Sequence, residues 1–146
     1  MSSRLLALSL VGAALLLAGC GGESVTGMEG ANESRGKTLF VEAAEGKPSC
    51  GSCHTLADAA TVSQIGPDLD QAFGYACRQG FDESTFFGVV RGQIDLPAEG
   101  GEMPPDLFTG QDAVDVAAYV ASVAGRNIEG CGETTTGAVT TAEDDS

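Results

Sequence analysis

Apolar positions along the chain recur at helical spacing in short stretches that are separated by long polar or glycine-rich segments. Within residues 34–44, Leu39, Phe40 and Ala43 share one helical face, and Gly46 follows as a stop signal. No stretch alternates apolar and polar residues in the manner of a half-buried strand. The pattern therefore predicts short helices and no strands.

A second predicted helix lies in the middle of the chain. Asp82 is a suitable cap, and the helix that it opens buries Phe86, Val89 and Val90 before it ends near Gly92.

The last predicted helix begins at a pair that resembles a capping box, Thr109 and Asp112, and ends at Gly125. Its apolar stripe follows the i, i+3, i+4, i+7 spacing of one buried face. The stripe consists of Val116, Tyr119, Val120 and Val123.

The segments between these helices differ in character. Residues 50–60 contain good helix formers after a turn, whereas residues 66–68 read Gly-Pro-Asp, a turn signal. Residues 92–108 contain too many glycines and prolines for regular structure. A few short helices bury too little apolar surface to fill the interior of the domain by themselves. We therefore expect a group other than packed helices to occupy part of that interior.

The N-terminal segment has the pattern of an export signal. Residues 5–18 are almost wholly apolar, Arg4 is the only charge before them, and the run is too short to span a membrane comfortably. The residues Leu17 to Cys20 look like a bacterial lipobox, in which cleavage leaves a lipidated cysteine. We therefore expect a lipoprotein signal peptide at residues 1–19 and a lipidated Cys20, on the periplasmic face of the bacterial cytoplasmic membrane. The alternatives are an ordinary signal peptide and a short anchor helix.

Composition divides the rest of the chain. Residues 20–33 are small and polar and predict a flexible tether, residues 34–131 form the domain, and residues 132–146 predict a disordered, Thr-rich acidic tail. The formal net charge of −14 argues against nucleic acid as a partner and against charge-driven docking onto anionic lipids.

The strongest chemical motif is C-x-x-C-H at residues 50–54, the attachment pattern of a c-type haem. Cys50 and Cys53 are spaced to form two thioethers to one haem, and His54 then supplies an imidazole nitrogen to the iron. A thioredoxin-like redox pair needs a βαβ setting, and a zinc site needs a second pair of ligands, which a chain with a single histidine lacks. The motif predicts one covalent haem c.

The candidates for the second axial ligand of the haem iron can be reduced by elimination, since the chain has no second histidine. Met28 lies in the tether, Lys37 lies on the first helix, and Lys47 is too near the attachment motif to reach the opposite haem face. Met103 lies in a loop of glycines and prolines that suits a thioether ligand, although a core-filling methionine and an open site are the alternatives. His/Met ligation raises the reduction potential and leaves no free coordination position, which favours electron transfer.

These motifs together resemble the small monohaem class I cytochromes c, over about residues 34–125. The resemblance implies an all-α small cytochrome c fold, with three to four short helices and long loops around one covalently bound haem. It also implies that Gly36, Phe40 and Tyr119 form a crossing of the first and last helices, where glycine lets two backbones approach closely.

The resemblance extends to the haem ligands. The Gly-Pro-Asp-Leu sequence that ends at Leu69 looks like the family's Gly-Pro-x-Leu motif, and Met103-Pro104 looks like its axial loop. By this likeness, the Pro67 carbonyl accepts a hydrogen bond from His54 and fixes the ring, and Leu69 packs on the haem.

Two arginines and two cysteines remain to be assigned. Arg78 and Arg91 are candidate partners of the haem propionates, and solvated arginines are the plain alternative. After Cys20 and the haem cysteines are counted, Cys77 and Cys131 are left, which predicts a disulfide in an oxidising compartment. A bridge that closes a loop of about 50 residues contributes about 4 kcal/mol in the chain-entropy estimate. Two free thiols are the alternative.

These features predict an electron carrier, not an enzyme. We expect a monomer that shuttles electrons between respiratory-chain complexes, from a quinol-oxidising donor to a terminal oxidase or reductase. The acidity suggests a basic docking patch on the partners, although it could equally serve solubility. The competing hypotheses are a haem-based peroxidase or gas or redox sensor with a displaceable Met103, and a permanently docked subunit.

Overall fold

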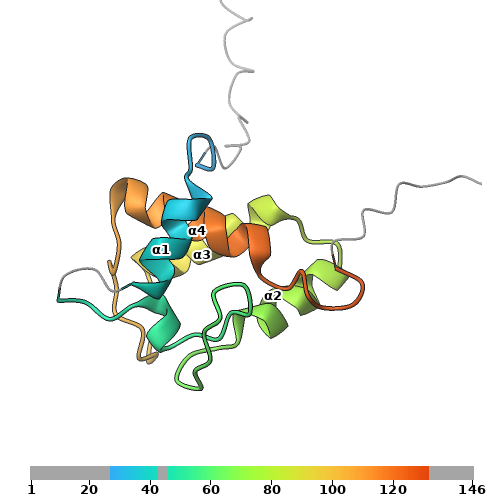
Figure 1. Ribbon diagram of the computed structural model, residues 1–146, viewed down its shortest axis with the longest axis horizontal. Coiled ribbons are helices and arrows are strands. Elements are labelled where there is room, and N and C mark those ends of the chain that lie inside the picture. Colours follow the sequence, from blue (N-terminus) through green and yellow to red (C-terminus); the bar gives the residue numbers. More distant parts are fainter. Residues whose placement is uncertain (1–26, 43–45, 132–146) are drawn as a thin grey trace, which may run out of the picture.

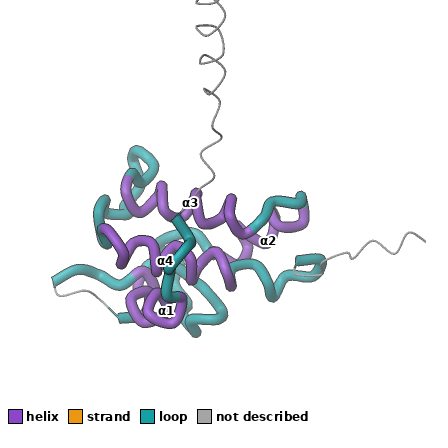
Figure 2. Tube along the Cα trace, turned by 90° about the horizontal axis from the view of Figure 1, so that it is seen from above, coloured by secondary structure: helices purple, strands orange, loops and turns teal. Residues whose placement is uncertain are grey.

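The computed structural model describes residues 27–42 and 46–131 and places a small helical domain there. Its elements in chain order are α1 (Glu33–Val41), the 3-10 helix η1 (Cys50–Ser52), α2 (Leu69–Arg78), α3 (Glu83–Asp95) and α4 (Gly110–Val123). Figure 2 shows helices joined by loops, with no strand in this described part of the chain. The predicted all-α fold with three to four short helices and long loops is confirmed.

Several predictions concern residues outside the described ranges. The signal peptide, the lipidated Cys20 and the acidic tail fall there. Within the described ranges, no helix combines the length and apolar character needed to cross a bilayer. Residues 27–32, the end of the predicted tether, contact the domain, because Met28 packs against the core and Asn32 caps α1.

A close crossing of α1 over α4 organises the domain (Figure 1). A Cβ atom built on Gly36 would lie 2.0 Å from the Asp115 carbonyl oxygen and 2.8 Å from the Tyr119 Cβ. Next to this contact, Phe40 and Tyr119 meet edge to face, with ring centroids 5.9 Å apart. Only glycine fits at the contact, so α1 and α4 touch backbone to backbone, as the predicted crossing requires.

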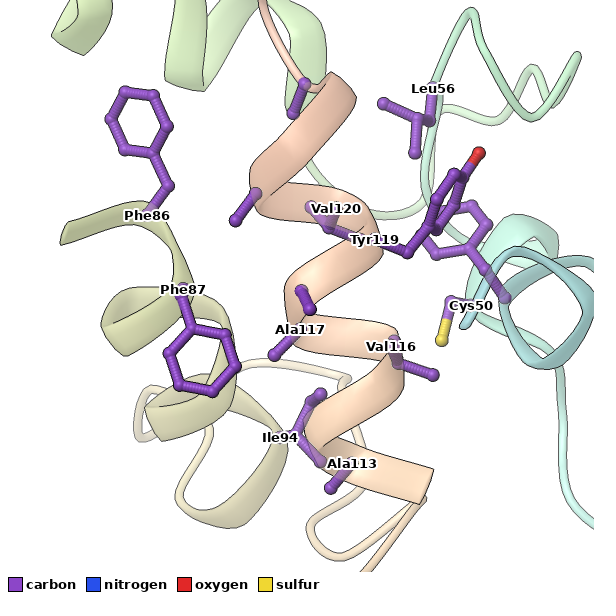
Figure 3. Close-up of a cluster of buried hydrophobic side chains, with 14 of the residues drawn as sticks. Cys50, Leu56, Phe86, Phe87, Ile94, Ala113, Val116, Ala117, Tyr119 and Val120 are labelled. Carbon is purple, nitrogen blue, oxygen red and sulfur yellow. The ribbon is translucent and has the colours of Figure 1, made fainter. Parts of the chain in front are cut away.

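The opposite side of α4 is covered by α3. Figure 3 shows Phe86 and Phe87 of α3 on one side of α4, and Leu56, Tyr119 and Cys50 on the other. Because α4 is apolar nearly all round, it lies at the centre of the domain. Its buried positions are Ala113, Val116, Ala117, Ala118, Tyr119, Val120 and Ala121, together with one charged residue, Asp115.

Asp115 is held in place by partners from two helices. It accepts hydrogen bonds from the Asn32 backbone N–H at 2.9 Å, from Gln111 at 2.8 Å and from Arg35 at 3.0 Å. Burial disfavours the charged form, but these donors outweigh it and hold the pKa of Asp115 below its usual value. A buried carboxylate with three donors thus ties the start of α1 to α4.

The segment that follows α4 fixes α2. A Cβ on Gly125 would lie 2.4 Å from the Gly74 amide nitrogen, and a Cβ on Gly74 would lie 2.5 Å from the Ile128 side chain. The structure joins Cys77 to Cys131 as a disulfide, with Cα atoms 5.6 Å apart. In Figure 1 this red segment runs beside α2. Residues 124–131, which we term the C-terminal strap, therefore hold α2 against the domain by close packing and by a disulfide.

The helix predicted within residues 50–60 was wrong beyond its first turn. Only η1 forms, because side-chain hydroxyls then bind the backbone in place of helical partners. Thr61 Oγ1 donates to the His54 carbonyl at 3.0 Å, and Thr55 Oγ1 donates to the Ser63 carbonyl at 2.8 Å.

Other helix ends also differ from expectation. The sequence pattern missed α2, although Asp68 caps it by accepting a hydrogen bond from the Gln71 backbone N–H at 3.0 Å. The helix α3 begins after Asp82 as predicted but continues past Gly92 to Asp95. The predicted cap of α4 was wrong in its chemistry, because Thr109 occupies the N-cap position without a side-chain hydrogen bond.

The Gly36 contact makes a testable prediction about stability. Gly36→Ala should lower the free energy of unfolding by about 1–3 kcal/mol, because the added methyl group forces α1 and α4 apart. The matched control is Gly88→Ala on α3, where an added Cβ meets nothing within 4 Å. It should be neutral or stabilising by about 0.5–1 kcal/mol. Denaturant unfolding of both variants checks this, and equal effects would contradict the crossing.

Candidate functional site

A predominantly apolar cavity of about 450 Å³ collects the motif residues of the sequence. Cys50, Cys53, His54 and Met103 all line it, although Met103 is distant from the others in the chain. The volume is that of a site for a large organic ligand. The apolar walls come from α1, α2, α3, α4 and the loop after α3, through Phe40, Leu69, Phe73, Val90, Ile94, Leu107, Val116 and Val120.

The orientation of His54 is fixed by one hydrogen bond. Its Nδ1 lies 2.9 Å from the Pro67 carbonyl oxygen, and since a carbonyl only accepts, Nδ1 carries the proton. This leaves Nε2 as the nitrogen available to a metal. A Cβ on Gly66 would lie 2.7 Å from the His54 ring, so glycine is required beside it.

The two motif cysteines differ in exposure. Cys50 is buried and Cys53 is partly exposed, and neither is in a disulfide. Burial raises the pKa of the Cys50 thiol to about 11. A thiol that resists ionisation is a poor redox nucleophile, which disfavours the thioredoxin-like interpretation of the motif.

Met103 lies in the segment between α3 and α4, residues 96–109, which we term the Met103 loop. The side chain is partly buried and contacts the hydrophobic core. The other candidates for the second axial ligand lie elsewhere. Lys37 binds Asp58, Lys47 binds the backbone of the Met103 loop, and Met28 is not part of the cavity wall.

The structure does not bring the two candidate arginines to the cavity. Arg91 forms an ion pair with Asp95, one turn along α3, and Arg78 lies beside Gly130 of the C-terminal strap. Neither lines the cavity, and α3 presents Val89, Val90, Gln93 and Ile94 to it instead of Arg91. Polar side chains that do line the cavity, besides those already named, are Ser49, Gln93 and Glu102.

Sequence reasoning missed the residues that fix the segment after His54. Asp70, buried at the start of α2, accepts from the Ala57 backbone N–H at 2.7 Å and from that of Gly125 at 3.0 Å. Asp58 accepts from Lys37 and from the Tyr119 hydroxyl, each at 2.8 Å. These two carboxylates tie the segment to α1, α4 and the strap. Only the three-dimensional fold pairs them with their donors.

The donor set fits a covalently attached haem. Two thiols, an imidazole with a free Nε2 and a thioether meet in one apolar cavity. Within residues 27–42 and 46–131, no group of three or more His, Cys, Asp or Glu side chains is arranged to hold a metal ion by itself. The chemistry of the cavity is therefore that of a haem site.

The Asp58 contacts predict a pH dependence of stability. Hydrogen bonds from Lys37 and then Tyr119 hold the pKa of Asp58 below its usual value. A carboxylate whose pKa is lower in the folded state stabilises above its unfolded pKa of about 3.9, and the gain is lost as the pH falls through the folded value.

Asp58→Asn should therefore lower the free energy of unfolding at pH 7 by about 0.5–1 kcal/mol, since the carboxylate is partly exposed. The difference from the wild type should shrink below about pH 4, where the carboxylate of the wild type is protonated as well. Denaturant unfolding from pH 7 to pH 3 measures it. A difference that is constant with pH would contradict the role of the charge.

The chain was compared with protein families, curated proteins and solved structures. The sequence profile of the family described as Cytochrome c matches residues 33–124. Among solved structures, the c-type cytochrome SorU from Sinorhizobium meliloti is 33% identical, with 63% of this chain and 90% of that chain covered and a TM-score of 0.47. No curated protein matches the chain.

Proposed function

The chain belongs to the cytochrome c family and binds haem c covalently, and from this premise we propose that it is a membrane-anchored extracytoplasmic electron carrier of class I with His54 and Met103 as axial ligands. The observation that carries the proposal is the convergence of Cys50, Cys53, His54 and Met103 on one apolar cavity. The four side chains supply two attachment points and two ligands of different softness.

Each of these side chains has a defined task. Cys50 and Cys53 hold the haem through thioethers, and His54 offers Nε2 to the iron while Nδ1 donates to Pro67. Met103 would offer a thioether sulfur, a soft donor that favours ferrous iron and so would raise the reduction potential of the haem. When bound, haem c supplies one-electron chemistry.

Apolar side chains on the inner wall of the cavity are almost fully shielded from solvent. Phe40 and Val116 are each 1% exposed and Ile94 is 3% exposed, and all three line it. An apolar wall of this kind would favour the lower-charged state of the iron in a bound haem. If His54 and Met103 both bind the iron, no coordination position is left for a substrate. This arrangement favours a carrier over an enzyme.

The charges near the cavity support a basic docking patch on the partners. Glu99, Glu102 and Asp106 are exposed on the Met103 loop, and Glu102 also lines the cavity. Opposite charge on a partner would speed the encounter and permit quick release. We propose a quinol-oxidising complex as donor and a terminal oxidase or reductase as acceptor, with this protein as a monomeric shuttle.

The ligation is tested by carbon monoxide. The absorption spectrum of the ferrous wild-type protein should stay unchanged when carbon monoxide is added, because both axial positions are held. Met103→Ala should bind carbon monoxide at once. The matched control is Met28→Ala, since Met28 packs on the core away from the cavity wall and its loss should leave the spectrum insensitive. Rapid binding to the wild type would instead favour a peroxidase or a gas or redox sensor.

The membrane anchor is tested separately. The full chain expressed in a bacterium should fractionate with the membrane and incorporate labelled fatty acid at Cys20. Cys20→Ser should lose the label and leave the membrane fraction, with an unchanged haem spectrum, because the lipid and the haem use different cysteines. Retention of the variant in the membrane fraction would point to the apolar N-terminal segment as the anchor.

A further inference from the structure

The Met103 loop is weakly tied along most of its length. Among the described residues, those at 99–105 make no hydrogen bond to any part of the protein outside the loop. The Gly101 backbone N–H bonds within the loop, to the Ala98 carbonyl at 3.1 Å. Pro104 and Pro105 have no N–H to donate. The position of Met103 therefore depends on how the two ends of the loop are held.

The C-terminal end of the loop is its firmest anchor. The Asp106 backbone N–H donates to the Ile94 carbonyl of α3 at 2.9 Å, which closes the loop at its base. Leu107 and Phe108 follow and are 8% and 4% exposed. Met103 lies shortly before Asp106 in the chain, and Pro104 and Pro105 stand between them. The proline rings restrict rotation of this backbone, so a movement of the base is passed on to Met103.

One side chain from outside reaches this base. Lys47 Nζ donates to the carbonyl oxygens of Asp106 at 2.7 Å and Leu107 at 3.1 Å. These are the only hydrogen bonds among the described residues that join the loop to the segment before Cys50. Lys47 thereby connects the stretch of chain that carries the attachment motif to the stretch that carries Met103.

We propose that Lys47 is a positioning residue for Met103. It holds the base of the Met103 loop against the segment before Cys50. This contact slows an opening of the loop that would move the Met103 thioether away from the iron. An ammonium group shared by two carbonyls suits this task, because both bonds are charge-assisted and both are lost together. The inference rests on the proposed function in one respect, that Met103 is an axial ligand.

The variant Lys47→Met removes the donors and keeps most of the side chain. Imidazole is the probe, because it binds ferric iron only after Met103 leaves. Its binding rate to the ferric holoprotein should rise about fivefold to tenfold, the factor expected when exposed charge-assisted hydrogen bonds are lost. Lys47→Arg, which restores a donor, should bind imidazole more slowly than Lys47→Met.

The matched control is Lys37→Met, which changes the net charge equally. Lys37 binds Asp58 at 2.8 Å and does not contact the Met103 loop, so the imidazole rate should remain that of the wild type. A rise of the same size in both lysine variants would assign the effect to charge and overturn the proposal.

A second readout does not depend on the iron ligands. Hydrogen exchange of the Asp106 amide reports opening of the loop base directly. It should accelerate by a similar factor in Lys47→Met and stay unchanged in Lys37→Met. Equal exchange rates of the Asp106 amide in the wild type and in Lys47→Met would overturn the proposed role of Lys47, even if Met103 is a ligand. Carbon monoxide binding to the wild type would instead refute the ligation, whatever the exchange shows.

Discussion

The backbone contact between α1 and α4 at Gly36 is the constraint from which the rest of the domain follows. It brings Phe40 against Tyr119, and Phe40 is also part of the cavity wall. It sets the start of α1 beside Asp115, which accepts hydrogen bonds from Asn32 and Arg35, and these two bonds resist separation of the two helices. A shift of this crossing would therefore deform both the core and the site.

The segments that carry His54 and Met103 are supported in different ways. The segment around His54 is held by several hydrogen bonds, which involve the Pro67 carbonyl and the side chains of Thr61, Asp58 and Asp70. The segment that carries Met103 has few bonds of its own and depends on its buried base. If His54 and Met103 are the axial ligands, as we propose, the weaker support of the Met103 loop would make Met103 the ligand that is more easily displaced.

Sequence reasoning succeeded where the determinant is local or bound to a specific motif. The C-x-x-C-H motif and the stripe of α4 are patterns of residue type and spacing, and the family match bears out the cofactor and the fold. It missed α2, because Gly-Pro-Asp at residues 66–68 is also a turn signal, and it took Asp68 as part of a turn and not as the N-cap of a helix. It predicted a helix after Cys50, where the hydroxyls of Thr55 and Thr61 compete for the backbone. The partners of Lys47 and Asp70 lie far along the chain, so no local pattern could reveal them.

The disulfide between α2 and the C-terminal strap has a consequence for how the protein matures. The described residues contain four cysteines, and any two of them can be joined, so six different single disulfides are possible. Only the pairing of Cys77 with Cys131 leaves Cys50 and Cys53 free for the haem. An exported chain must therefore undergo oxidation at one pair of sulfurs while the other pair stays reduced. If the chain is exported as we propose, Cys131 would emerge after the attachment motif, because it follows the motif in the sequence. Haem loading and oxidation would then compete for the sulfurs of Cys50 and Cys53.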